Sequence, residues 1–131
     1  MLCAASCAWA RPRIPSATRS ADAIEASEFF WYAFHNGLYE LIPDVLNVWT
    51  AAYLNDPNAP KTAAYIGAAH AWRLNERARL DPVLVTITDA AVFARKFVQE
   101  TVRLEPHDAH YIGFLSSMMI WKPIFTETTT L

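Results

Sequence analysis

The tripeptide Tyr-Ile-Gly occurs twice in this chain, as Tyr65–Gly67 and as Tyr111–Gly113. Each copy follows a corner that contains proline and stands near the start of a segment with helical spacing of apolar residues. The corners read Asn-Asp-Pro-Asn at 55–58 and Leu-Glu-Pro-His at 104–107. Proline interrupts a helix, and small residues let two helices approach closely. The two copies therefore predict a repeated unit in which helices are joined by a proline corner.

The helix that precedes each corner carries a second repeated pattern. A bulky residue, a smaller residue and the corner proline follow one another at spacings of three and five residues. The two sets are Trp49, Ala52 and Pro57, and Val98, Thr101 and Pro106. Large residues at such positions fill the space between helices, and small ones permit contact between backbones.

This pattern resembles the tetratricopeptide repeat (TPR) family, whose units place small, bulky, small and corner-proline positions in the second helix. Pro57 and Gly67 stand ten residues apart, as in that family. Gly37-Leu38-Tyr39 is similar to its Gly-x-Tyr turn between paired helices. The resemblance covers about residues 21–121, in roughly two and a half units. It implies antiparallel helix pairs stacked as a short TPR-like α-solenoid.

The chain also departs from that family. The corner prolines Pro57 and Pro106 are 49 residues apart, whereas a TPR unit has a period of about 34 residues. Ser116 stands ten residues after Pro106, where the family has glycine. A loop expected over residues 78–87 accounts for the extra length.

Helical periodicity dominates from Ala21 onward, and signals for β-strands are scarce. We therefore predict an all-α domain over 21–121 with about five helices. Their expected ranges are 21–36, 39–55, 60–77, 89–104 and 109–121. Thr88 and Asp108 are the predicted N-caps of the last two helices.

Composition limits the classes of protein that fit. Of 131 residues, 53% are apolar and 18% are charged, so the chain can build a core and is not intrinsically disordered. Its charge-free stretches are shorter than the roughly 20 residues of a membrane-spanning helix. A formal net charge of −2 argues against binding of nucleic acid.

Residues 1–20 differ from the rest, because Met1–Ala21 contains arginine, serine and proline but no acid. We expect a leader or linker here, and three origins stay open. The three are a disordered tail, an organellar transit peptide, and the remnant of a bacterial lipoprotein signal lipidated at Cys7. The expected location is cytoplasmic as written, or the bacterial envelope if an upstream start restores that signal. Residues 122–131 are expected to form a flexible tail.

The fifth helix lacks a partner helix, and at least three repeats are normally needed for stability. This predicts either a piece of a longer array or a homodimer that covers the exposed face. The expected contact patch consists of Phe114, Met118, Met119 and Trp121.

The histidines are the natural candidates for chemistry. His107 and His110 flank a helix start and, with Asp108, form a weak candidate metal site. His70 is expected to be a core histidine whose polar atoms are satisfied. No His-Glu-x-x-His pattern, glycine-rich phosphate loop or nucleophile elbow is present. We therefore predict no catalytic residues, no metal and no cofactor. A metal- or small-ligand-binding domain that uses these histidines and His35 is the alternative function.

The resemblance implies a non-catalytic module that binds a protein or peptide in a groove built from the first helix of each unit. By that resemblance, the groove residues are Trp31, His35, Lys61, Trp72, Asn75 and His110. Lys61 and Asn75 are suited to hold a peptide carboxylate or backbone.

Overall fold

The computed structural model describes residues 15, 16, 18–79 and 87–120. Within them the chain forms five α-helices and no strand. The helices are α1 (Ala21–His35), α2 (Ile42–Asn55), α3 (Pro60–Asn75), α4 (Ile87–Leu104) and α5 (Ala109–Met119). Two short 3-10 segments, η1 (Tyr39–Leu41) and η2 (Glu76–Arg79), precede α2 and follow α3. The predicted all-α class with five helices is confirmed.

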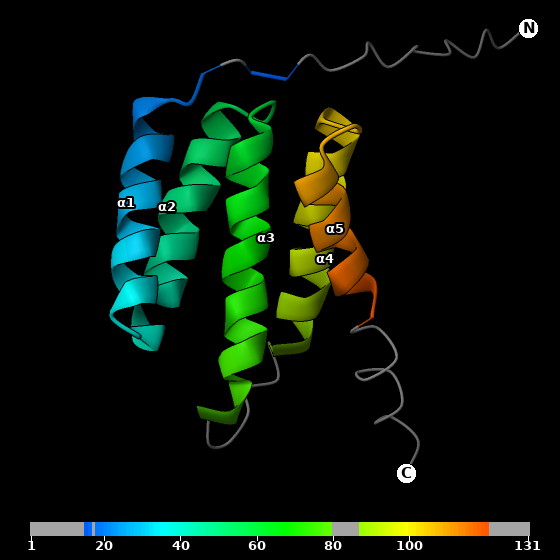
Figure 1. Ribbon diagram of the computed structural model, residues 1–131. Helices are drawn as coiled ribbons and strands as arrows, with labels where there is room; N and C mark the ends of the chain where they lie inside the picture. The colour runs from blue at the N-terminus through cyan, green and yellow to red at the C-terminus, as the bar shows by residue number, and fades with distance from the viewer. Residues whose placement is uncertain (1–14, 17, 80–86, 121–131) are drawn as a thin grey trace, which may run out of the picture.

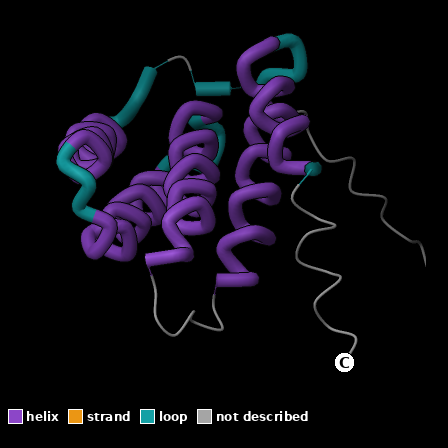
Figure 2. Tube along the Cα trace, turned by 60° about the horizontal axis from the view of Figure 1, so that its bottom comes forward, coloured by secondary structure: helices purple, strands orange, loops and turns teal. Residues whose placement is uncertain are grey.

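Consecutive helices run in opposite directions along the stack (Figure 1). Each helix packs against the next one in the sequence. Figures 1 and 2 together show two layers, with α1, α3 and α5 on one face and α2 and α4 behind them. The first helices of successive pairs therefore share one face of the stack.

The helix ends follow from local sequence. The Ser20 hydroxyl accepts a hydrogen bond from the Ala23 N–H and caps α1, and the Asp108 carboxylate caps α5 as predicted. After α1 the chain turns at Gly37, whose φ of +64° favours glycine. The predicted N-cap at Thr88 is wrong, because α4 already begins at Ile87.

The core has two parts that meet at α3. The first lies among α1, α2 and α3 around Trp49, which is completely buried and stacks on Tyr65 with ring centroids 4.9 Å apart. The second lies among α3, α4 and α5. It consists of Ala71, Leu74, Ala90, Ala94, Val98 and Met118. The central helix thus presents aromatic residues to one neighbour pair and small aliphatic residues to the other.

The closest approach in the fold joins α3 and α4 at Gly67. A Cβ atom on Gly67 would lie 2.6 Å from Val98 Cγ2 and 3.1 Å from the Ala94 carbonyl oxygen. Thr101 is buried, and its hydroxyl lies 3.3 Å from the Pro60 carbonyl at the start of α3. Glycine at this position is therefore a packing requirement.

Ordered structure begins before the predicted domain boundary at residue 20. The Ser16 N–H donates to the Asn58 carbonyl at 2.8 Å, and the Ser16 hydroxyl donates to Asp56 Oδ1 at 2.9 Å. These bonds attach the segment before α1 to the corner between α2 and α3. Cys7 and the predicted tail at 122–131 lie outside the described residues.

None of the described helices combines the length and the apolar character required to cross a bilayer.

The two glycines of the repeated motif form a matched pair for a stability experiment. We expect Gly67→Ala to lower the free energy of unfolding by about 1–3 kcal/mol, because the new methyl group overpacks a stiff β-branched side chain and a backbone oxygen. Gly113 has no heavy atom within 4 Å of the equivalent position. We expect Gly113→Ala to raise stability by up to about 1 kcal/mol through helix propensity.

Urea denaturation of both variants, followed by circular dichroism, measures the two effects. Equal stability of Gly67→Ala and the unaltered protein would contradict the close contact between α3 and α4.

Candidate functional site

A groove of about 300 Å³ lies between α3 and α5. We call it the α3–α5 groove. Its lining consists of Lys61, Ala64, Tyr65, Ala68, His110, Tyr111 and Phe114. Two alanines on α3 leave room between larger rings, which makes the lining apolar with a polar rim. Such a surface accommodates an apolar side chain of a ligand.

The rim of the groove comes from the first turns of two helices. Lys61 is the second residue of α3, and His110 is the second residue of α5. Asp108 accepts hydrogen bonds from the backbone N–H groups of His110 at 2.8 Å and Tyr111 at 3.3 Å. This cap holds the start of α5 in place and presents the exposed His110 ring beside the carboxylate, with Nδ1 3.4 Å from Asp108 Oδ1.

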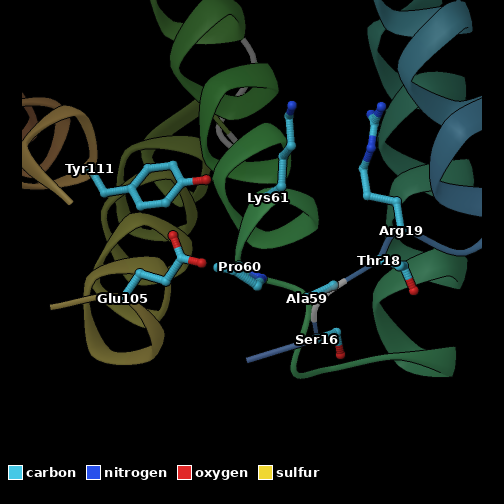
Figure 3. A pocket seen from close by; sticks show the side chains of 8 residues that line it. All are labelled: Ser16, Thr18, Arg19, Ala59, Pro60, Lys61, Glu105 and Tyr111. Atoms are coloured by element: carbon cyan, nitrogen blue, oxygen red, sulfur yellow. The ribbon is translucent and has the colours of Figure 1, made fainter. Parts of the chain in front are cut away.

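A second cavity of about 310 Å³ adjoins the groove and shares Lys61 and Tyr111 with it. We call it the polar cavity. It is lined by Ser16, Thr18, Arg19, Ala59, Pro60, Lys61, Glu105 and Tyr111. Figure 3 shows the Lys61 and Arg19 side chains extending in the same direction, with Tyr111 and Glu105 across from them. Three segments distant in sequence therefore meet here.

The polar cavity carries charges of both signs. Lys61 and Arg19 bring two positive charges, and Glu105 brings one negative charge. Burial, followed by the nearby carboxylates of Glu105 and Asp108, raises the pKa of Tyr111 above its ordinary value. The phenol therefore stays protonated at neutral pH and can donate a hydrogen bond to a ligand.

Aromatic side chains continue the groove toward α1. Trp31 Nε1 donates a hydrogen bond to the Tyr65 hydroxyl at 3.3 Å. His35 stacks on the Trp31 ring with centroids 5.3 Å apart. Trp31 remains 40% exposed, so part of its ring is available for contact with a ligand.

The structure places two of the six predicted groove residues, Lys61 and His110, in the lining of the α3–α5 groove. Trp31 contacts that lining through its hydrogen bond to Tyr65. His35 stacks on Trp31 at the end of α1 and does not line the groove.

Of the other two groove predictions, the one for Trp72 is corrected by its placement, and the one for Asn75 stays a prediction. Trp72 is only 8% exposed and packs edge-on against Phe34 of α1 with centroids 5.0 Å apart, so it belongs to the core. Asn75 is exposed at the last residue of α3. It lies 14 positions after Lys61, a rise of about 21 Å, so the two side chains would contact different parts of a bound peptide.

Sequence reasoning missed several lining residues, including Arg19, Glu105 and both tyrosines of the repeated motif. The tyrosines had a usable signal, since their identical position before Ile-Gly predicts that both face the same way. Arg19 and Glu105 had none, because only the packing of the corners places them beside α3.

The predicted dimer patch is wrong in composition. Met118 is 4% exposed and packs in the core beside α3 and α4, and Phe114 is partly buried against the same cluster. Met119 is 47% exposed, and Trp121 lies outside the described residues. The open face of α5 lies on the side away from Phe114 and Met118.

The four histidines are not gathered at one place. His35 ends α1, whereas His107 and His110 lie at the opposite end of the stack, at the corner before α5 (Figure 1). Among the residues that the structure describes, no three His, Cys, Asp or Glu side chains are grouped so that they could hold a metal ion.

His70 lies between α3 and α4. Its ring lies 5.3 Å from the ring of Phe93 and 6.4 Å from that of Phe97. Nδ1 is buried without a hydrogen-bond partner among the described residues, so the prediction of a satisfied core histidine is corrected. Burial, and secondarily the charge of Arg73, lowers the pKa of His70 from 6.5 to about 4.

No family model, no curated protein and no solved structure matches this chain. The geometry of the described residues therefore carries the functional argument.

The low pKa of His70 predicts a pH dependence of stability. Between pH 6.5 and about 4 the unfolded chain takes up a proton that the folded chain does not. The stabilising contribution is thus complete above pH 6.5 and is lost as the pH falls through this window, by up to about 3 kcal/mol. We expect His70→Phe to show a smaller fall in the free energy of unfolding over this window, measured by urea denaturation.

The exposed His107 supplies the matched control, because His107→Phe removes a histidine outside the core. Identical pH profiles for His70→Phe and His107→Phe would contradict the buried neutral state of His70.

Proposed function

We propose that this chain is a non-catalytic, TPR-like helical-repeat module that binds an extended segment of a protein partner in the α3–α5 groove. The observation that carries the proposal is the continuity of an apolar groove with a polar cavity through Lys61 and Tyr111. The α3–α5 groove is largely apolar and can receive one side chain of a peptide. The adjoining polar cavity bears two positive charges and one negative charge.

An extended peptide advances about 3.3 Å per residue, with alternate side chains on opposite sides. A segment lying along α3 would place an apolar side chain over Ala64 and Ala68. A carboxylate a few residues away would lie near Lys61 and Arg19, where the opposite charges attract. Exposed aromatic surface at Trp31 would extend the contact toward α1, since tryptophan contributes strongly to protein interfaces.

Two polar side chains near the groove and the polar cavity serve the fold, which supports a binding role over a catalytic one. The Ser16 hydroxyl is bonded to Asp56, and the Asp108 carboxylate caps α5. Neither is arranged as a nucleophile with an adjacent general base.

Two proposals about the ends of the chain stand beside this one. A lipid anchor at Cys7 would place the module at a bacterial envelope, and further repeats would lengthen the groove.

A library of random linear peptides displayed on phage, selected against the full chain, tests the groove. We expect selected peptides to combine an acidic residue with a nearby apolar one. Their affinity, measured by fluorescence anisotropy, should fall roughly tenfold or more, which is about 1.4 kcal/mol or more, in Ala64→Trp and in Lys61→Glu. The first change fills the groove, and the second repels the carboxylate.

Leu54→Trp and Lys96→Glu are the matched controls, because both positions are exposed on helices of the other layer. They should bind the selected peptides as tightly as the unaltered protein, with circular dichroism confirming that all four variants fold. Full affinity of Ala64→Trp for those peptides would rule out the groove as the binding site.

A further inference from the structure

Helices α3 and α5 carry the same motif, so their residues can be compared position by position. When the two helices are aligned on Tyr-Ile-Gly, the faces that pack against the preceding helices have similar surroundings. Tyr65 stacks on Trp49 of α2, and Tyr111 lies in the groove against α3. Trp72 and its counterpart Met118 are both buried against the preceding helices. Helix α5 therefore sits on α3 and α4 much as α3 sits on α1 and α2.

The face of α3 that packs against α4 is covered. Ala63 is 0% exposed and Leu74 is 1% exposed, and Ala71 and Leu74 pack in one cluster with Ala94 and Val98 of α4. At Gly67 the covering helix is α4, whose Val98 side chain and Ala94 carbonyl come within contact distance. A small residue on α4 and a β-branched residue four positions later thus sit over the glycine of α3.

The equivalent face of α5 is open. Ile120, the counterpart of Leu74, is 68% exposed. Ile112 is 43% exposed, whereas its counterpart Ile66 is buried in the core that α3 shares with α1 and α2. Among the described residues, no heavy atom lies within 4 Å of where a Cβ atom would stand on Gly113. Ala109 and Ser117 lie on the same side and are also exposed. The close-approach positions carry small side chains, although no helix of the described part of the chain covers them.

A helix that ends a repeat stack against water usually carries a polar outer face. Helix α5 has no Asp, Glu, Lys or Arg between Ala109 and Met119. Its open face instead consists of isoleucines and small, uncharged residues. These properties are those of the covered face of α3, and they indicate a surface that packs against another helix.

We propose that the outer face of α5, formed by Ala109, Ile112, Gly113, Ser117 and Ile120, binds an amphipathic α-helix of a partner protein. The partner helix takes the place on α5 that α4 has on α3. It runs antiparallel to α5, sets a small residue over Gly113 and carries a β-branched residue four positions further on. This surface is separate from the α3–α5 groove and extends the stack by one helix.

The cover seen inside this molecule argues for a partner helix over a second copy of the chain. Helix α4 has 18 residues, about 27 Å in length, and exposes Lys96, Gln99 and Arg103 to water. A second copy would offer the open face of its own α5, which has 11 residues and a length of about 16 Å. Two such short helices bury little of the roughly 1,200 Å² that a stable dimer needs.

A fluorescent peptide with the sequence of Ile87–Leu104 is the probe, because it reproduces the helix that covers the equivalent face. We expect the full-length protein to bind it saturably in fluorescence anisotropy. Gly113→Leu should weaken binding roughly tenfold or more, because the added side chain blocks close approach while the open space around Gly113 keeps the fold intact. An Ala94→Leu peptide should lose affinity for the same reason.

Asn47→Leu, at an exposed position on α2, is the matched protein control and should bind the probe normally. Thermal unfolding should show that Gly113→Leu retains its stability. Absence of saturable binding, or equal binding by Gly113→Leu, would overturn the proposal. Sedimentation of the protein as a dimer that Gly113→Leu converts to a monomer would also overturn it, since a second copy would then occupy the face.

Discussion

The contact between α3 and α4 at Gly67 is the constraint on which the rest of the structure depends. Helix α3 lies at the centre of the stack and packs against α2 on one side and α4 on the other. The missing side chain at Gly67 lets Val98 and the Ala94 backbone pack closely against the α3 backbone. The position of α4 then determines where the corner at Glu105 and the start of α5 come to lie. Both cavities, which α5 helps to line, follow from that close approach.

The two sides of α3 are built on different principles. Toward α1 and α2 it presents aromatic rings, with Tyr65 stacked on the buried Trp49. Toward α4 it presents small residues that allow the backbones to approach. Large rings and close contacts are both ways to fill space at the density of a protein interior. Because α5 carries the same motif, it keeps the same two-sided character, and its small-residue side remains open.

The two proposed binding surfaces lie at different places on the stack. The α3–α5 groove lies on the face shared by the first helices and is lined by the charged Lys61, and the adjoining polar cavity adds Arg19 and Glu105. The outer face of α5 lies at the end of the stack and has no charged side chain. A charged, polar-rimmed groove suits an extended peptide, whereas a small apolar face suits a helix. The experiments on Ala64 and Gly113 address the two surfaces independently.

The sequence by itself determined the all-α class, the approximate helix ranges, the proline corners and the cap at Asp108, because these depend on local periodicity and backbone chemistry. The resemblance to the TPR family also pointed to Lys61, His110, Trp31 and His35 as surface candidates. Tertiary structure alone decided that Trp72 and Met118 are buried, since two apolar faces of one helix cannot be ranked before its neighbours are known. It also decided that Arg19 and Glu105 join Lys61 around one cavity, because that meeting depends on how separate corners pack.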